Sequence, residues 1–299
     1  MKVGITGASG FLGTAIMAEG KSRGWTVVAY SRGGHPVERA DETRPLVEPE
    51  CIDLAGIDAL IHLAGEPIAG IWTEDKKRRI RESRLDLTSG LVKAMGRLPG
   101  GSRPAVFVSA SAIGYYGDRA DEWLDEESDV GFGFLPAVCR DWEGASSAAE
   151  KLAVRVVNPR IGLVMGREGF LKRIRTIFKL GLGGRLGRGN QWMSWIHVRD
   201  LACLFAECVE NGSIHGRVNC VSPRPVTNRE FTTVYARVLA RPAIFPVPAF
   251  LLKRLPGGMG SLFLDSQRVE PVVMRSFDFE WSFPDLESAL RDIERKSRA

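Results

Sequence analysis

The chain has 299 residues, of which 44% are hydrophobic and 26% are charged, so its composition is that of an ordinary globular protein. This composition excludes intrinsic disorder, which requires low hydrophobicity together with a high net charge. The net charge of +5, from 41 basic and 36 acidic residues, permits anionic ligands or nucleic acid as partners without selecting either.

The first predicted elements are a strand, a glycine-rich turn, a helix and a second strand. Lys2–Thr6 and Trp25–Tyr30 are the strands, and Gly7, Gly10 and Gly13 follow the first one with the spacing G-x-x-G-x-x-G. In this context Gly7 permits the tight turn, Gly10 lets a pyrophosphate approach the backbone, and Gly13 lets the helix pack closely on the strand. The free N–H groups at the start of the helix then face the phosphates. The pattern predicts a dinucleotide-binding turn.

The end of the second strand indicates which dinucleotide is bound. A carboxylate at this place binds the ribose 2′-hydroxyl of NAD, whereas an arginine accommodates the 2′-phosphate of NADP. This chain has Ser31 and Arg32 there, and its next acidic residue is Glu38. We therefore predict that the cofactor is NADP(H), with Arg32 at the 2′-phosphate.

Strands and helices continue to alternate along the next part of the chain. Residues 59–64, 105–109 and 153–157 are predicted strands, and residues 74–98 are a predicted helix. Strands separated by helices indicate an α/β fold with a doubly wound parallel sheet, in which ligands bind at the carboxyl ends of the strands. The helix starts with a charged run that lacks aromatic residues, so we interpret it as a solvated face and not as a nucleic-acid site. Arg84, at the end of the run, is predicted to reach back toward the cofactor.

The segments after residue 160 read as a smaller substrate-side region. Gly169–Leu182 is a predicted helix whose basic face is either solvated or forms a lip over an anionic substrate. The glycine-rich loop from Gly181 to Asn190 can approach a ligand or act as a lid. His197 is expected to be a core histidine. After Pro223 prolines interrupt the chain, which indicates short helices and not more sheet.

Targeting signals and metal ligands are not evident in the sequence. No stretch reaches the roughly 18 uninterrupted apolar residues of a membrane-spanning helix. The N-terminus continues directly into the first strand without a signal-peptide pattern. The five cysteines, an odd number without a Cys-x-x-Cys pair, favour neither disulfides nor zinc, and the four histidines lack metal-ligand spacing. We expect a reducing, cytoplasmic compartment and no metal.

Several motifs resemble the extended short-chain dehydrogenase/reductases, which include the nucleotide-sugar epimerases. The glycine turn, residues 62–65 and residues 109–117 carry this resemblance. A closer resemblance, over essentially the whole chain, is to the atypical branch known as "epimerase family" proteins. It rests on the motifs at residues 64–68, 138–143, 160–166, 183–187, 195–200, 218–228, 266–271 and 277–279.

The resemblance implies a Rossmann domain that binds NADP(H) and a smaller C-terminal region. We expect the first at residues 1–160 and 190–222, and the second at residues 161–189 and 223–299. The implied cofactor contacts are Gly7, Ser9, Gly10, Phe11 and Leu12 at the pyrophosphate and Arg32 at the 2′-phosphate. Gly13 and Ser31 are further candidate cofactor-binding residues. Leu63, Ala64 and Gly65 are expected at the ribose and adenine, and Ser109, Arg160 and Ile161 near the nicotinamide.

The catalytic residues of the resembled superfamily are only partly present. Typical members use Ser, Tyr and a Lys four residues after the Tyr, and Ser111 fits the first role. The Tyr and Lys positions hold Cys139 and Glu143. Since a carboxylate raises the pKa of a neighbouring thiol, this pair is not an activated one.

Three hypotheses about catalysis stay open. In the first, Cys139 or one of Tyr115 and Tyr116 performs the acid–base step while Ser111 orients the substrate. In the second, water or the substrate supplies the proton. In the third there is no turnover, and the protein senses or carries NADP(H). We predict an NADP(H)-dependent oxidoreductase or epimerase-like protein that acts on a small polar molecule, or else a non-catalytic regulator or scaffold. As partners we expect neither nucleic acid nor a membrane, and the chain is predicted to be a monomer or a homodimer.

Overall fold

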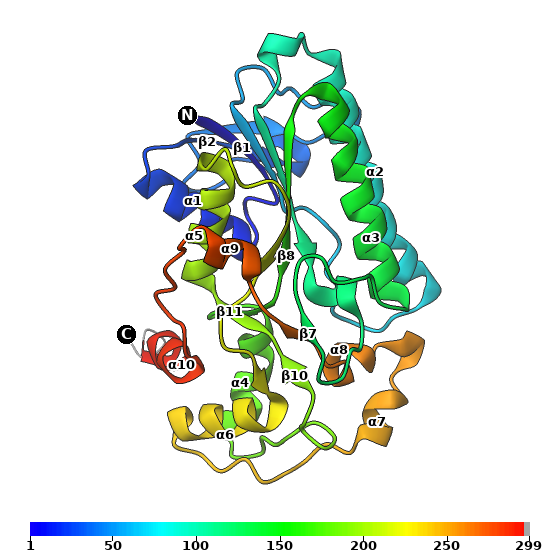
Figure 1. Ribbon diagram of the computed structural model, residues 1–299, viewed down its shortest axis with the longest axis vertical. Helices are drawn as coiled ribbons and strands as arrows, with labels where there is room; N and C mark the ends of the chain where they lie inside the picture. Colours follow the sequence, from blue (N-terminus) through cyan, green and yellow to red (C-terminus); the bar gives the residue numbers. More distant parts are fainter. Residues whose placement is uncertain (296–299) are drawn as a thin grey trace.

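A twisted parallel sheet forms the centre of the upper part of the molecule in Figure 1. The computed structural model describes residues 1–295. The strands run in the order β12-β8-β5-β4-β1-β2-β3, with β6 also paired to β8. Their bounds are Lys2–Thr6 (β1), Thr26–Ser31 (β2), Glu42–Pro45 (β3), Ala59–His62 (β4), Val106–Ser109 (β5), Ser111–Ala112 (β6), Arg155–Ile161 (β8) and Gly216–Cys220 (β12). The direction of strand order reverses between β1 and β4, so this is the topological switch point of a Rossmann sheet.

Helices cover both faces of the sheet, as the predicted α/β fold requires. The helices α1 (Phe11–Ser22) and α5 (Val198–Glu210) lie on one side, and α2 (Glu74–Arg97) and α3 (Phe134–Ser147) lie on the other (Figure 1). Ile16 and Phe205 pack with the strands on the first side, and Leu91 and Met95 on the second. Because both faces are buried, the central strands β1, β2, β4 and β5 consist mostly of apolar residues.

Most of these elements were predicted from the sequence, but four were missed. Strands at 2–6, 59–64 and 105–109 and the helix at 74–98 agree with the structure to within two residues. The missed elements are β3, β12, β6 and α3. The first two strands carry several polar residues, and β12 includes the buried Asn219. Their strand character depends on pairing with a neighbour in the sheet and not on local propensity.

A second hydrophobic core holds the lower part of the molecule together. The helices α4 (Phe170–Lys179), α6 (Asn228–Leu239) and α10 (Leu286–Arg295) surround it. Thr227 begins α6 with a capping box, in which its side chain and that of Glu230 each accept a hydrogen bond from the backbone N–H of the other. The remaining elements are short: β7 (Trp123–Leu124), β9 (Leu163–Met165), β10 (Trp192–Met193), β11 (Trp195–His197), β13 (Val226–Thr227), β14 (Arg268–Val269), α7 (Ala249–Lys253), α8 (Ser261–Leu264) and α9 (Val272–Ser276).

The predicted division into two regions stays a prediction, and its last residues, 296–299, lie outside the described residues. The packing of Trp195 concerns the boundary between the two regions. Trp195, which the sequence analysis places in the first region, is buried in the second core with Phe231 and Leu290. Strand β11 therefore connects the two cores.

His197 is a core histidine, as expected from the sequence. Its side chain caps α5 by accepting a hydrogen bond from the Arg199 backbone N–H, and its ring lies 4.0 Å from the ring of Phe283. Three residues later, Asp200 accepts from the backbone N–H groups of Ser282 and Phe283. The His-x-x-Asp motif thus holds the C-terminal segment against the sheet.

The described residues, 1–295, contain neither a membrane-spanning helix nor a metal-binding cluster of side chains. None of the helices there has both the length and the apolar composition that a bilayer crossing requires. In the same part of the chain, His, Cys, Asp and Glu side chains form no group of three or more that could hold a metal ion.

Candidate nucleotide site and the buried network beneath it

The glycine turn joins β1 to α1 at the switch point of the sheet. Gly7 has a φ of +73°, and its carbonyl accepts a hydrogen bond from the Gly10 N–H at 3.0 Å. A Cβ on Gly13 would lie 2.3 Å from the same carbonyl oxygen, so only glycine allows the helix to begin this close to the strand. No side chain caps the helix at Gly10, and its first turn carries no acid. These N–H groups are therefore oriented for an anion such as a pyrophosphate.

The residues after β4 lie directly beside the turn. A Cβ on Gly7 would come within 3.0 Å of the Ala64 nitrogen, and the Leu63 N–H donates to the Thr6 carbonyl. The predicted contacts Leu63, Ala64 and Gly65 therefore border the same edge of the sheet as the turn.

The end of β2 contributes to a surface hollow of about 460 Å³ beside the turn. Ser9 and Ser31 line the hollow together with residues 35–39. Arg32 is exposed, and no ion pair involves it within residues 1–295. An exposed arginine that forms no ion pair among the described residues fits, at this place, the negative 2′-phosphate of NADP. The hollow also includes His35 and Arg39, which the sequence analysis did not single out.

Arg84 supports the loop behind the turn. Its Nη1 donates to the carbonyls of Glu66 and Ile80, at 3.0 Å in each case, and its guanidinium lies 5.1 Å from the Trp142 ring. Burial lowers its pKa below the ordinary value. The contact to the cofactor that we predicted for Arg84 stays a prediction, and in this structure its hydrogen bonds hold the backbone at residue 66.

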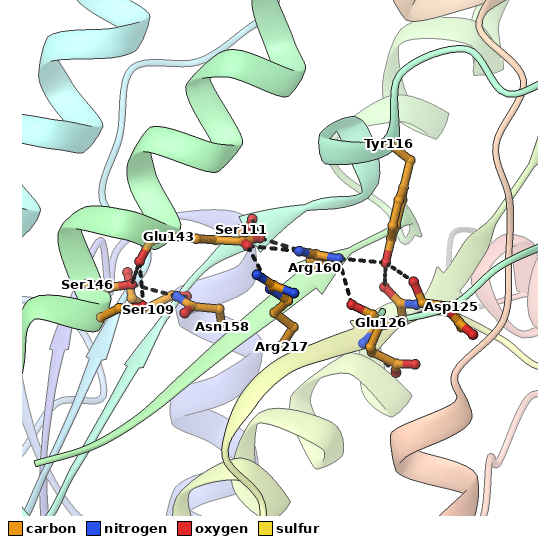
Figure 2. Close-up of polar contacts among 12 residues, drawn as sticks. Ser109, Ser111, Tyr116, Asp125, Glu126, Glu143, Ser146, Asn158, Arg160 and Arg217 are labelled. Atoms are coloured by element: carbon orange, nitrogen blue, oxygen red, sulfur yellow. Dashed lines mark hydrogen bonds and ion pairs between the residues drawn. The ribbon is translucent and has the colours of Figure 1, made fainter. Parts of the chain in front are cut away.

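Ser111, Glu143 and Arg160 form a buried network at the end of the sheet (Figure 2). The Ser111 hydroxyl donates to Glu143 Oε1 at 2.6 Å. Arg160 donates from Nε and Nη2 to the two oxygens of the same carboxylate, at 2.9 Å in both cases. The Arg160 side chain is completely buried, and the Glu143 side chain is 8% exposed. Burial by itself lowers the pKa of Arg160, but the hydrogen bonds to Glu143 raise it above the ordinary value.

Tyr116 extends the network, and its hydroxyl has hydrogen-bond partners on both its donor and its acceptor side. Its hydroxyl accepts from Arg160 Nη1 at 2.9 Å and lies 2.7 Å from Asn219 Oδ1 and 2.8 Å from the Asp125 carbonyl. Burial raises the pKa of Tyr116 to about 12. Tyr115 lies on the other side of the arginine, with its ring 3.5 Å from the guanidinium carbon. Of the two tyrosines, Tyr116 is therefore a structural partner of Arg160.

Cys139 lies one helical turn before Glu143 and is buried. Burial, and then the Glu143 carboxylate, raise the pKa of its thiol to about 12. This direction agrees with the expectation that the carboxylate disfavours a thiolate. Cys139 therefore remains a thiol at neutral pH, and a thiol is a weak acid–base group.

Ser109 and Ile161 end the neighbouring strands β5 and β8. The Ser109 carbonyl accepts from Asn158 Nδ2, whereas its buried hydroxyl has no hydrogen-bond partner within residues 1–295. Asn158, Asn219 and Glu126 were missed by the sequence analysis. The signal that could have identified the two asparagines is a polar residue inside an otherwise apolar strand, because such a residue must find a partner.

The glycine-rich loop at residues 181–190 is attached on both sides. The Phe245 N–H donates to the Gly183 carbonyl, and the Gly187 N–H donates to the Val247 carbonyl. Leu186 donates its N–H to the side chain of Asn228 at the start of α6. These bonds do not fit a mobile lid, and they make the loop part of the lower body of the molecule.

Comparison with known proteins adds independent information. Residues 3–220 match the model of the NAD dependent epimerase/dehydratase family, and residues 247–293 match a domain of unknown function. An SDR39U1 homolog of Arabidopsis thaliana, described as a chloroplastic epimerase family protein, is 37% identical over 98% of this chain and 86% of its own length. The epimerase family protein YfhF of Bacillus subtilis is 34% identical over 98% of both chains. The crystal structure of human SDR39U1 with NADPH has a TM-score of 0.90 and 31% identity, and covers 99% of both chains.

Proposed function

This chain belongs to the NAD dependent epimerase/dehydratase family, and we propose on that premise that it binds NADP(H) and transfers hydride to or from a small polar substrate. The observation that carries the proposal is the turn at Gly7–Gly13, where a Cβ on Gly13 would overlap the backbone and the start of α1 has no side-chain cap. The exposed Arg32 beside the hollow at Ser31 supports NADP(H) over NAD(H). The relative of known structure that contains NADPH supports the same cofactor.

Bound NADP(H) would supply hydride chemistry at its nicotinamide ring. The chain's own contribution concerns the substrate oxygen and the proton. Cys139 is a buried thiol and the Tyr116 hydroxyl is occupied, so neither is suited to transfer a proton. Tyr115 is the last candidate of the first hypothesis, and its ring is covered by the Arg160 guanidinium at 3.5 Å. We therefore favour the second hypothesis, in which water or the substrate supplies the proton. Ser111, held by Glu143, then orients the substrate.

A second candidate function is a non-catalytic NADP(H)-binding regulator or scaffold. It is favoured by the Glu143–Arg160 pair, which fills the place of the usual catalytic Lys with a closed structural contact. The compartment in which the protein works stays a prediction under both functions.

The cofactor proposal is tested by replacing Arg32. We expect Arg32→Ala to weaken NADPH binding by about 10- to 100-fold, because a charge-assisted contact to phosphate is lost, and to leave NADH binding almost unchanged. Isothermal titration of both cofactors measures this. Arg78→Ala, an exposed arginine on α2, is the control and keeps the original affinities. Equal weakening of NADPH and NADH binding by Arg32→Ala would contradict the assignment of the 2′-phosphate.

Turnover is tested separately. The protein is incubated with NADPH or NADP⁺ and a panel of carbonyl compounds, alcohols and nucleotide sugars, and nicotinamide absorbance and sugar products are followed. The oxidoreductase proposal expects turnover of one class and a loss of kcat, without loss of cofactor affinity, in Ser111→Ala. Tight NADPH binding with no turnover across the panel favours the regulator.

A further inference from the structure

The lower end of the molecule carries an unusual surface that the cofactor site does not explain. Two long stretches of the chain contain no acidic residue, one between Glu168 and Asp200 and the other between Glu230 and Asp265. In Figure 1 they build α4, α6 and α7, and the segment between α6 and α7 runs along the lower edge. We call this surface the lower basic face.

Large apolar side chains are exposed on the lower basic face. They are Leu180, Leu182, Ile244, Phe245, Phe250 and Leu251, with exposed fractions between 48% and 72%. The bridge between Leu182 and Ala243 and the hydrogen bond from the Phe245 N–H to the Gly183 carbonyl bring the first four together. Phe250 and Leu251 follow on α7, whose first residue, Ala249, would lie 3.2 Å from a Cβ on Gly187. A cluster of this kind on a protein surface indicates a binding surface, because isolated exposed apolar residues are common but grouped ones are not.

Basic side chains accompany the apolar ones. Lys179, Arg185, Arg188, Arg241, Lys253 and Arg254 are all exposed, and none of these six forms an ion pair with another residue of the range 1–295. Two carboxylates of the neighbouring helix α10 pair with other basic residues of this face, Glu294 with Arg175 of α4 and Glu287 with Arg237 of α6. They neutralise part of the charge of the face but not the charge of the six unpaired side chains, which fits an anionic partner.

We propose that the lower basic face binds the surface of a membrane that contains anionic phospholipids. The exposed aliphatic and aromatic side chains would enter the boundary between head groups and acyl chains, while the Lys and Arg side chains remain among the anionic head groups. The prolines at 242, 246 and 248 stiffen the connecting segment. A nucleic acid would neutralise the basic side chains but would not bury the exposed leucines and isoleucine. Two copies of this basic face would repel each other.

This proposal differs from the expectation of no membrane partner, which depended on the absence of a long apolar segment. A peripheral contact needs no such segment, because apolar residues from separate parts of the chain meet only after folding. The proposal is independent of the cofactor site, which lies at the edge of the sheet near Gly7.

Co-sedimentation of the full chain with lipid vesicles tests the proposal. We expect binding to vesicles of phosphatidylcholine with about one third phosphatidylglycerol, little binding to phosphatidylcholine alone, and a decrease as salt is added. Lys253→Glu with Arg254→Glu should lower the partition coefficient at least about 20-fold, since each basic residue near an anionic surface contributes roughly a factor of five. Phe245→Glu with Phe250→Glu should lower it at least about 10-fold, because the insertion of apolar surface is lost.

Matched controls separate a specific surface from general effects. Phe132→Glu changes a fully exposed phenylalanine elsewhere, and Lys151→Glu reverses an exposed lysine after α3. Both should bind vesicles as the original chain does, and NADPH titration verifies that every variant is folded.

Three outcomes would overturn the proposal. The first is that the original chain does not bind anionic vesicles. The second is that the double variant at Phe245 and Phe250 binds vesicles as well as Phe132→Glu does, which would leave only a basic patch. Tight binding of a labelled oligonucleotide in place of vesicles would lead to the same conclusion. The third is a dimer that these substitutions dissociate while vesicle binding is absent, which would make the face a contact between two copies.

Discussion

At the scale of single residues, the most informative feature is the buried carboxylate of Glu143. It accepts hydrogen bonds from Ser111 and Arg160, and so its carboxylate is one half of a buried ion pair. Burial of two charges is costly, and the hydrogen bonds between them offset this cost only while both partners are present. The pair therefore holds β6, α3 and β8 in a fixed relation.

Replacing Arg160, one partner of the buried ion pair, should show how much the stability of the fold depends on the pair. We expect Arg160→Met to lower the free energy of unfolding by about 3–5 kcal/mol, because it leaves the buried Glu143 carboxylate with only the Ser111 hydroxyl and the half-exposed Arg217, whose Nε lies 3.8 Å away. Urea denaturation followed by circular dichroism measures the change. The control is Arg140→Met, which breaks the exposed pair with Asp141 and should cost less than about 1 kcal/mol. Similar losses in the two variants would contradict the importance of the buried pair.

Asp265 provides a prediction about pH. Burial, and then the nearby Asp118, raise the pKa of its carboxyl to about 6. The folded chain therefore holds this proton more tightly than the unfolded chain does. The contribution of Asp265 to the free energy of unfolding is therefore fully present below about pH 4 and is lost as the pH rises through about 6. Because Asp265 is partly exposed, the expected loss is only about 1 kcal/mol.

Asp265→Asn should remove this part of the pH dependence and make the chain more stable than the original at pH 7. Urea titrations of both chains across the range from about pH 4 to pH 7 give the difference. Asp86→Asn, which changes an exposed carboxylate on α2, serves as the control. A difference between the original chain and Asp265→Asn that stays constant across this range would refute the prediction.

At the scale of elements, the turn between β1 and α1 depends on a glycine inside a helix. A glycine in another helix, Gly144, has no such purpose. Gly144 in α3 has nothing within 4 Å of the position of a Cβ among the described residues, whereas Gly13 in α1 would overlap the backbone of Gly7 and Ala8. The same substitution should therefore have opposite effects in the two helices.

We expect Gly13→Ala to destabilise the fold by about 1–3 kcal/mol through overpacking, and to abolish NADPH binding by displacing the turn. Gly144→Ala should stabilise the fold by about 0.5–1 kcal/mol, because alanine is the better helix former, and should leave NADPH binding unchanged. Chemical denaturation and NADPH titration of both variants check the pair. A neutral Gly13→Ala would show that the turn tolerates a side chain.

At the scale of the whole molecule, two cores are joined through β11 and through the glycine turn. Phe11 of α1 packs on the lower part of the chain, since a Cβ on Gly166 would lie 2.4 Å from its ring. The residue that follows the pyrophosphate turn thus contacts both regions. A cofactor held by the turn should stabilise both cores together.

NADPH should therefore raise the melting temperature in one cooperative transition. At a concentration about 100 times its Kd, a ligand contributes about 2.7 kcal/mol, which corresponds to roughly 5 °C for a chain of this size. Differential scanning calorimetry with NADPH and with NADH measures the shift, and NADH at the same concentration should produce less. Two separate transitions, of which only one moves, would show that the two cores unfold independently.

The sequence by itself determined the parallel α/β architecture, the glycine turn and the family. Each of these depends on residues that are close together in the chain, such as Gly7, Gly10 and Gly13 between a strand and a helix, and local sterics make such patterns readable. The presence of Cys139 and Glu143 at the positions of the usual catalytic pair was equally visible. The charge of Glu143 predicted the direction in which the thiol pKa moves, whereas burial, the larger cause, depends on the fold.

Only the tertiary structure decided what these residues contact. Arg160 is 17 positions from Glu143 and 44 from Tyr116, and only the meeting of α3 with β8 makes them one network. The lower basic face likewise arises from two stretches separated by some thirty residues that are brought together by backbone hydrogen bonds. Contacts between distant parts of a chain are fixed by how its cores pack, and packing is a property of the whole fold and not of any local pattern.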